Sequence, residues 1–493
     1  MKNVLIIGSG LGSLATALRL SSRGYQVTIF EQYHQAGGRL NRLDIDGFKF
    51  DLGPSFMSMS YELDELFTSC AIPNPFKLTE LDPLHHVYFS HRAKPYRIWK
   101  NLKKLEAEFS DVEPDLAAKL EPYLKRAKAF YHDTDQAIIK TNFYGYADYA
   151  RKLCRVPVKH LPYVFRSLWS EVSSNFSSQE VRVILSLIAF FLGTTPFKTP
   201  AIFSMLNYVE LQHNGYWTVE GGIYHIVEKL VELLKARGVQ FVFRTSVVTV
   251  EEKTRQAVAV VDHTGKRWAA DIFICNADAA SFRGEILRRK KYSPARLDKM
   301  EWSMAPFTLY LGVRGKIPAV AHHNYFLGSN FEEYSRTIFT STTSPQKPYY
   351  YMNVPTKSHP EYAPDGCESL FVLCPVPDLR FKKDWADRDN LADQIIQDLS
   401  LRIGFDIPRN IVVKKILTPV EWREMFNLYQ GSGLGLCHGF TQLGIFRPQN
   451  KDENLKNFYY VGASTIPGTG LPMVIISSKL VLERIQHDSA AIS

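Results

Sequence analysis

Gly8 and Gly10, near the start of the chain, have the spacing of the first two glycines of a turn that binds a dinucleotide, and Gly12 follows them. Backbone N–H groups bind the pyrophosphate, and a side chain at Gly8 or Gly10 would block its approach. The helix expected after the turn would direct its partial positive N-terminus at the same anion. Glu31 stands about 20 residues further on, where a carboxylate accepts hydrogen bonds from ribose hydroxyls. An acidic residue there favours an unphosphorylated ribose, so the pattern indicates FAD or NAD rather than NADP.

The third glycine of this fingerprint is replaced by Ser13. Serine is small, so a helix and a strand can still pack closely at this position. A glycine triplet alone can also be a plain helix-capping turn. Here a strand, a turn, a helix, a second strand and a terminal acid follow in order, which favours the dinucleotide site.

A second glycine turn, Gly37-Gly38-Arg39, comes soon after Glu31. It allows another close approach to a cofactor, and Arg39 could offset the negative charge of a pyrophosphate or a flavin. The alternative is an ordinary surface turn with a solvated arginine. Together with residues 48–55, this second contact favours FAD over NAD.

The elements that must position these residues come in three blocks. Short apolar runs predict parallel strands, and apolar residues at helical spacing predict the helices between them. The predicted strands are residues 4–7, 27–30, 239–243, 247–251, 258–261, 271–275 and 457–461, and the predicted helices are residues 14–23, 223–235 and 474–485.

Two long insertions separate the blocks. The first is mostly helical, aromatic and basic, and the second reads as strands such as 307–313, 349–354 and 370–374. We therefore expect a mixed α/β and α+β fold: a discontinuous Rossmann-like FAD-binding domain with an inserted substrate-binding domain of mixed sheet and helices. The expected FAD-binding domain comprises residues 1–80, 216–281 and 416–493, and the expected substrate and membrane-associating domain comprises residues 81–215 and 282–415.

The composition is that of a folded globular protein, with 493 residues, 45% hydrophobic and 22% charged, and a formal net charge of +9. The basic excess suits an anionic partner or a solvated surface. Neither zinc-finger spacing nor an RNA-recognition motif stands out, so no nucleic-acid partner is expected. Six cysteines without a CxxC pair, and a first strand that follows directly on residues 1–3, indicate a reduced cytoplasmic protein without a signal peptide.

The motifs together resemble the flavin amine oxidase and carotenoid desaturase superfamily. The resemblance rests on GSGLGS, Glu31, GGR and DLGPS, and residues 457–472 (NFYYVGASTIPGTGLP) resemble the bacterial carotenoid (phytoene) desaturase signature. WTVEGG, Asn276-Ala277-Asp278, residues 364–377 and FRPQN are further similar stretches. The family usually has histidine where Ile466 stands and glycine where Met473 stands, so the chain looks most like the hydroxycarotenoid 3,4-desaturase branch.

The resemblance implies FAD as the cofactor and extends the set of residues that would hold it. To Gly8, Gly10, Gly12, Ser13, Glu31, Gly38 and Arg39 it adds Leu11, Gln32, Pro54, Ser55, Phe56, Val247, Asn276, Ala277, Gly462, Gly470, Leu471, Pro472 and Met473. Of these, Gly462 and residues 470–473 would lie against the isoalloxazine, and Val247 would contact the adenine side.

The implied reaction removes a hydride and a proton from neighbouring carbons of a polyene. Flavin accepts the hydride, and quinone or oxygen is the final electron acceptor. Asp148 and Arg151 match an aspartate and an arginine suspected of acid–base work in the family. Their spacing places them on one face of a helix. The alternative is a surface ion pair.

The segment 140–166 mixes basic and aromatic residues, which predicts a monotopic contact with a membrane or a merely solvated face. The apolar stretch 183–192 is about half the roughly 20 residues that a spanning helix needs, so it is a core helix, a tunnel wall or an interfacial helix. The paired histidines His85-His86 and His322-His323 lack metal-ligand spacing, so no metal site is expected.

We therefore expect a peripheral enzyme on the cytoplasmic side of the membrane. It would introduce a 3,4 double bond into a 1-hydroxy acyclic or monocyclic carotenoid. Alternatives are a phytoene desaturase, a carotenoid isomerase or flavin amine oxidase of the same fold, or a non-catalytic flavoprotein that escorts Rab-type GTPases.

Overall fold

The computed structural model describes residues 2–490, apart from the side chain of Phe440, and is built around two sheets. The first has five parallel strands in the order β19-β13-β1-β2-β9. Three of its four neighbouring pairs join segments far apart in the chain, as expected for a discontinuous Rossmann-like domain. The strands are β1 (Asn3–Ile7), β2 (Gln26–Phe30), β9 (Gln240–Val242), β13 (Ile272–Cys275) and β19 (Phe458–Tyr460).

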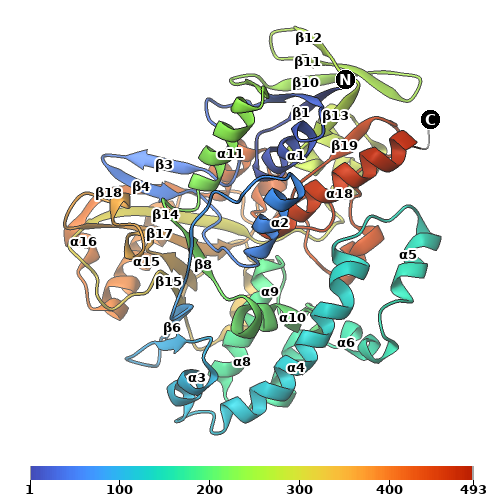
Figure 1. The fold of residues 1–493 in the computed structure, drawn as a ribbon. Coiled ribbons are helices and arrows are strands. Elements are labelled where there is room, and N and C mark those ends of the chain that lie inside the picture. The colour runs from blue at the N-terminus through green and yellow to red at the C-terminus, as the bar shows by residue number, and fades with distance from the viewer. Residues whose placement is uncertain (1, 491–493) are drawn as a thin grey trace.

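Both faces of this sheet are covered, because successive strand residues point to opposite sides. Val4 and Ile6 pack against one core, and Leu5 and Ile7 pack against another. Helices cover the first face and a small antiparallel sheet covers the second (Figure 1). The helices are α1 (Leu11–Ser21), α2 (Tyr61–Ser69), α11 (His225–Ala236) and α18 (Leu471–Ala490), and the small sheet is β10 (Val247–Lys253), β11 (Gln256–Asp262) and β12 (Arg267–Ala269).

Two helices begin earlier than the apolar pattern predicts. We expected the first at residue 14 and the last at residue 474, but they begin at Leu11 and Leu471. Each helix begins directly after a glycine, Gly10 or Gly470. The first residue of each helix is therefore set by the glycine turn before it, and the apolar pattern begins only later in the helix.

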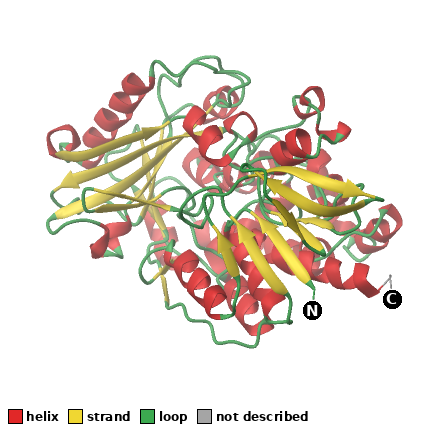
Figure 2. Ribbon diagram, turned by 90° about the horizontal axis from the view of Figure 1, so that it is seen from above, coloured by secondary structure: helices red, strands yellow, loops and turns green. Residues whose placement is uncertain are grey.

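The second sheet has seven strands in the order β18-β14-β17-β16-β15-β6-β7. All neighbours are antiparallel except β6 and β15, which are parallel, so the sheet is mixed as expected. The two sheets lie on opposite sides of the molecule (Figure 2). The strands are β6 (His85–Phe89), β7 (Tyr96–Ile98), β14 (Ala305–Arg314), β15 (His323–Leu327), β16 (Tyr350–Asn353), β17 (Cys367–Val376) and β18 (Ile411–Leu417).

Strands β6 and β7 lie in the insertion that we expected to be mostly helical. They are the edge of the large sheet, and β6 opens with two histidines that hide its apolar alternation. The expected boundary at residue 415 falls inside β18, and the limits of the two domains stay a prediction.

The rest of the first insertion is a helical layer. It comprises α3 (Leu102–Phe109), α4 (Leu116–Thr134), α5 (Tyr146–Leu153), α6 (Leu161–Phe165), α7 (Leu168–Asn175), α8 (Gln179–Ser186), α9 (Ile188–Phe191) and α10 (Met205–Tyr208). The apolar stretch 183–192 is divided between α8 and α9 and is largely buried.

Smaller elements complete the fold. Hairpin β3 (Arg42–Ile45) and β4 (Phe48–Asp51) packs against the large sheet, and β5 (Leu78–Glu80) pairs with β8 (Trp217–Val219). The remaining helices are α12 (Ala279–Ser281), α13 (Pro294–Leu297), α14 (Phe331–Thr337), α15 (Arg388–Ile403), α16 (Ile407–Asn410) and α17 (Pro419–Phe426).

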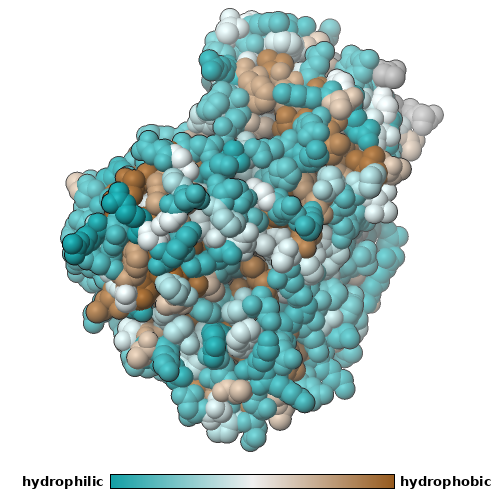
Figure 3. Space-filling model, turned by 60° about the vertical axis from the view of Figure 1, so that its left-hand side comes forward, coloured by the Kyte–Doolittle hydropathy of each residue, from teal (hydrophilic) through white to brown (hydrophobic). Residues whose placement is uncertain are grey.

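The surface is mainly polar. On the face in Figure 3, hydrophilic residues predominate and hydrophobic ones gather in separate patches. Within residues 2–490, none of the helices has the length and apolar character that a membrane span requires.

Candidate functional site

A cavity of about 1020 Å³ runs between the two sheets and the helical layer. This volume is at the upper end of the roughly 300–1,000 Å³ of ordinary ligand pockets. Every residue expected to hold the cofactor lines it, except Ser13 and Gly462. Ser13 is buried in α1, and Gly462 packs against Asn276. The cofactor role of all these residues stays a prediction, but the fold brings them together.

The glycine turn presents the N-terminus of α1 to the cavity. Gly8 has a φ of +86°, and Gly10 at the N-cap offers no side chain to the helix. The first turn of α1 holds no acidic residue. Its first amides are therefore open to an anion such as a pyrophosphate, and the observed turn fits a dinucleotide.

Gly10 is also required by the protein itself. A Cβ atom at Gly10 would lie 2.4 Å from Oδ1 of Asn276, and one at Gly12 would lie 3.1 Å from Nδ2 of the same side chain. Asn276 in turn donates through Nδ2 to the carbonyl of Val461, at 2.8 Å. This asparagine therefore links the turn to the end of β19.

Glu31 is held by the turn that it faces. Oε2 accepts from the backbone N–H and the hydroxyl of Ser9, at 3.0 and 2.5 Å, and Oε1 accepts from Tyr33 N at 3.0 Å. The carboxylate is thus fixed at the carboxyl end of β2, where it borders the cavity. It remains able to accept further hydrogen bonds from a ribose, because each carboxylate oxygen has two lone pairs.

Arg39 lies in the cavity wall rather than on the outer surface. Its guanidinium donates to the carbonyl of Gly433 at 2.7 Å. Burial lowers the pKa of Arg39, and the nearby Asp278 opposes that shift. A cation in this position suits an anionic group in the cavity, as a solvated surface arginine would not.

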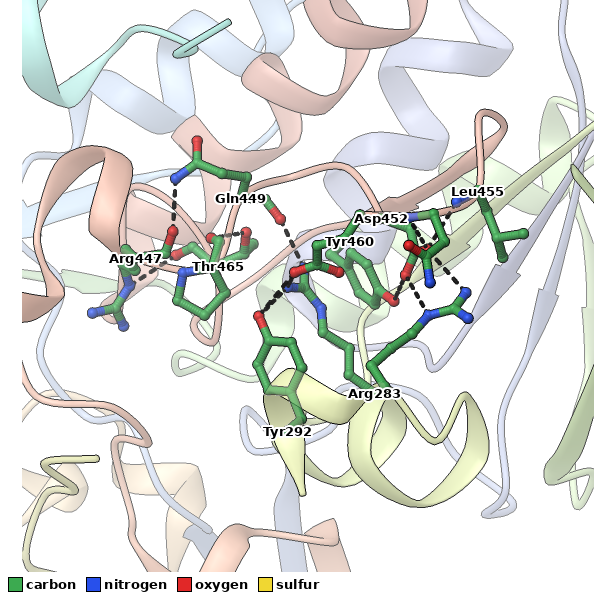
Figure 4. Close-up of polar contacts among 12 residues, drawn as sticks. Arg283, Tyr292, Arg447, Gln449, Asp452, Leu455, Tyr460 and Thr465 are labelled. Atoms are coloured by element: carbon green, nitrogen blue, oxygen red, sulfur yellow. Dashed lines mark hydrogen bonds and ion pairs between the residues drawn. The ribbon is translucent and has the colours of Figure 1, made fainter. Parts of the chain in front are cut away.

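A buried arginine fixes the loop between β19 and α18. The Arg447 guanidinium donates to the carbonyls of Thr465 and Ala463, at 3.2 and 3.0 Å, and to those of Leu436 and Cys437, both at 3.3 Å. Burial lowers its pKa to about 10. Figure 4 shows Arg447 beside Thr465, with Arg283 nearby between Tyr292 and Tyr460. Arg447 therefore ties the loop to the segment 436–438.

That segment carries His438, a cavity residue that the sequence did not reveal. Its backbone N–H and its Nδ1 both lie 3.1 Å from the carbonyl oxygen of Leu192. A carbonyl only accepts, so Nδ1 carries the proton and Nε2 is left as an acceptor. Burial lowers the pKa of His438 to about 3, so the ring is neutral. Ile466, where the resemblance described above leads one to expect a histidine, is buried.

Asp148 and Arg151 form the expected pair on α5, with 2.6 Å between Oδ1 and Nη2. Asp148 also accepts from Lys152 Nζ at 2.8 Å. Although burial raises the pKa of Asp148, the hydrogen bonds from Lys152 and Arg151 hold it well below its usual range. The cavity is lined by Tyr149 and Leu153 of the same helix and by neither member of the pair. These contacts are what the alternative interpretation, a surface ion pair, predicts. The acid–base role of the two residues stays a prediction.

Histidine, cysteine and acidic side chains could also hold a metal. Among residues 2–490, no group of three or more of them is arranged to hold a metal ion. The paired histidines instead pack among aromatic rings: His323 stacks on Phe56 with 4.0 Å between ring centroids, and His85 lies 5.2 Å from Tyr325.

Comparisons with known proteins agree with this geometry. The family model described as flavin containing amine oxidoreductase matches residues 14–485. The zeta-carotene-forming phytoene desaturase of Myxococcus xanthus is 32% identical over 490 residues, covering 98% of this chain and 94% of its own length. The 1-hydroxycarotenoid 3,4-desaturase of a Flavobacterium species is 28% identical, covering 99% of this chain and all of its own.

Solved structures share the fold. Putrescine oxidase bound to putrescine superimposes with a TM-score of 0.63 at 12% identity, covering 100% of this chain and 99% of the other. An oxidoreductase from Methanosarcina mazei also has a TM-score of 0.63, at 16% identity and 98% and 100% coverage. At these identities the likeness concerns the fold alone.

Proposed function

The chain belongs to the family of flavin-containing amine oxidoreductases and, within it, to the carotenoid desaturases, and from this premise we propose that it forms the 3,4 double bond of a 1-hydroxy carotenoid. The enzyme is an FAD-dependent oxidoreductase that acts on CH–CH groups. The position of the bond and the hydroxyl group are the proposal.

The observation that supports a polyene substrate is the character of the cavity wall beyond the glycine turn. There the lining is almost entirely aliphatic and aromatic, and it suits a long ligand without charges. These residues include Leu187, Ile188, Phe190, Phe191, Ile202, Phe203 and Leu206.

The reaction removes a hydride from one carbon and a proton from its neighbour, and FAD supplies the hydride acceptor when bound. The chain's own residues orient the polyene and keep water out of the cavity. Only a weak base is needed, because a cation delocalised along a polyene loses its proton readily. The acceptor that reoxidises the enzyme is proposed to be a quinone or oxygen.

We further propose that the segment 140–166 contacts the cytoplasmic face of a membrane. Large apolar side chains are exposed here: Tyr146 at 73%, Val158 at 81% and Leu161 at 53%. Exposed Arg155 and Lys159 lie among them. Other residues of the same segment, Leu153, Val156 and Val164, line the cavity. A polyene dissolved in the membrane would thus meet the cavity at this segment.

The test is expression in a host that makes several carotenoid intermediates, with the products separated and identified by mass. A loss of two hydrogens from a 1-hydroxy carotenoid is expected. Conversion of phytoene alone would support the second candidate, phytoene desaturation, which the Myxococcus xanthus relative favours. A product of unchanged mass would indicate an isomerase, and hydrogen peroxide released from a small amine would indicate an amine oxidase.

A further inference from the structure

A carboxyl group stands among the aliphatic and aromatic residues of the cavity wall beyond the glycine turn. Glu210 lies in a π-helical turn, Val209–His213, and lines the cavity while its side chain is buried. Such turns occur often at functional sites. Burial raises the pKa of Glu210 to about 8, and the nearby hydroxyl of Tyr216 opposes that shift. Burial in the cavity wall therefore favours the protonated, neutral form of the Glu210 carboxyl group.

The nearest histidine does not satisfy this acid. His85 Nδ1 is 3.4 Å from Glu210 Oε1, without hydrogen-bond geometry, and both ring nitrogens of His85 are buried without hydrogen-bond partners among the described residues. Burial also lowers the pKa of His85 to about 3, so the two groups do not form an ion pair. Because no charged partner accounts for the burial of this carboxyl group, its place in the cavity wall needs another explanation.

The carboxyl group is close to the residues expected to hold the cofactor. Tyr216 packs on Phe56 with 4.9 Å between ring centroids, and the next residue, Trp217, donates its backbone N–H to Met57 at 2.8 Å. Ser55 Oγ in turn lies 2.8 Å from the hydroxyl of Tyr351, which also lines the cavity. Tyr216 thus packs directly on Phe56, which is itself expected to contact the cofactor.

We propose that Glu210 and Tyr216 form a binding site for the hydroxyl group of the substrate. A protonated carboxyl group both donates and accepts, as an alcohol does, so the two match as a pair. The inference rests on the proposed function, in which the carbon that carries the hydroxyl is two bonds from the nearer carbon of the new double bond. A hydroxyl-binding group must then lie close to the cofactor, as Glu210 and Tyr216 do.

The test compares a 1-hydroxy carotenoid with its analogue lacking the hydroxyl. Binding to the reduced holoenzyme, which cannot turn over, is followed by the shift in polyene absorbance, and kcat and KM are measured separately. We expect the wild type to bind the hydroxylated polyene at least about tenfold more tightly. Glu210→Leu should bring that ratio close to one, whereas Glu210→Gln, which keeps a donor and an acceptor, should retain most of it.

Two further variants distinguish a specific loss of hydroxyl binding from general damage to the protein. Tyr216→Phe should reduce the ratio about threefold to tenfold, because it removes the hydroxyl group of the proposed site that lies near Glu210. Glu171→Gln is the matched control, since Glu171 is a buried acid held by Arg126 and Arg166 at 2.9 and 3.0 Å, away from the cavity. Its ratio should equal that of the wild type.

An unchanged ratio in Glu210→Leu, with normal flavin content, would overturn the hydroxyl site while leaving desaturation intact. A wild type that binds the hydroxylated polyene and its analogue equally well would also overturn the hydroxyl site. If no carotenoid is desaturated in any assay, the proposed function itself fails, and the binding ratio on the reduced enzyme still reports on the site.

Discussion

The imidazole of His438 occupies the space that a side chain at Gly468 would need. A Cβ atom at Gly468 would lie 2.0 Å from Nε2 of His438, and Gly468 has a φ of +145°. The glycine therefore allows a neutral histidine to lie directly against the loop that precedes α18. This contact joins two segments 30 residues apart, and both border the cavity.

The first prediction concerns this contact. Gly468→Ala should force the ring or the loop to move, with a cost of about 2–3 kcal/mol in unfolding free energy and a loss of bound FAD. Urea unfolding and flavin absorbance per protein measure both. Gly24→Ala is the control, because Gly24 also has a positive φ, +81°, but open space around it. It should cost about 1 kcal/mol and leave the flavin bound. Equal behaviour of the two variants would contradict the packing argument.

Arg447 supports a second prediction. Arg447→Met would remove a donor from four carbonyl oxygens inside the protein, of which, among the described residues, that of Cys437 alone keeps a second side-chain donor, Gln442. We expect a loss of about 3–5 kcal/mol in unfolding free energy, since breaking a buried polar network leaves its partners unpaired. Arg336→Met provides the comparison, because Arg336 pairs with Glu332 on the surface and should change stability by less than about 1 kcal/mol. A similar small effect at Arg447 would show that water replaces its contacts.

Part of the fold and of the candidate site can be predicted from the sequence. The glycine turn, the acid at Glu31 and the parallel strands follow from local spacing, because close backbone approach and buried strands restrict the residues used at each position. For Arg39 the sequence leaves two possibilities, a cofactor contact or a solvated surface turn, and only the fold places it in the cavity wall. The glycine turn, the acid and the strands are formed by residues close together in the sequence, so their patterns can be recognised there.

His438 and Glu210 carry no such local signal. Each is a single titratable residue whose meaning depends on segments brought together by the fold: Leu192 and Gly468 for the histidine, and Tyr216 and His85 for the acid. Strand β6 was missed for a related reason, since its two histidines look polar in the sequence but His85 is buried in the sheet edge. Long-range packing decides all three.

A third prediction is the pH dependence of stability. The pKa of Glu210 rises from an ordinary 4.5 to about 8 through burial, so the folded state keeps a proton that the unfolded chain releases. Relative to Glu210→Gln, the wild type should lose stability as the pH rises from about 4.5 to 8, by at most about 1.4 kcal/mol per pH unit. Above pH 8 the difference should level off. Comparing the two proteins cancels the contribution of Asp51, whose pKa burial also raises, to about 7. A difference that does not vary with pH would show that Glu210 is ionised in the folded protein.

The exposed apolar segment leads to a fourth prediction. Val158→Glu and Leu161→Glu should each weaken binding to anionic vesicles by about tenfold, because they place a charge where an apolar side chain would enter the membrane. Sedimentation with vesicles measures the bound fraction. Leu401→Glu is the control, since Leu401 is 84% exposed on α15, outside this segment. If all three variants lose binding equally, the membrane contact is not localised to residues 140–166.

The pair on α5 can be tested directly. Asp148→Asn keeps the size of the side chain but removes the charge that Lys152 and Arg151 contact. Because neither Asp148 nor Arg151 lines the cavity, we expect the turnover rate to change less than about threefold and its pH profile to keep its shape. Unfolding free energy should fall by about 1 kcal/mol, as for a partly exposed ion pair. A turnover rate lowered by about two orders of magnitude or more, together with a lost limb of the pH profile, would instead establish the acid–base role, because general acid–base catalysis contributes about 10²–10⁴-fold.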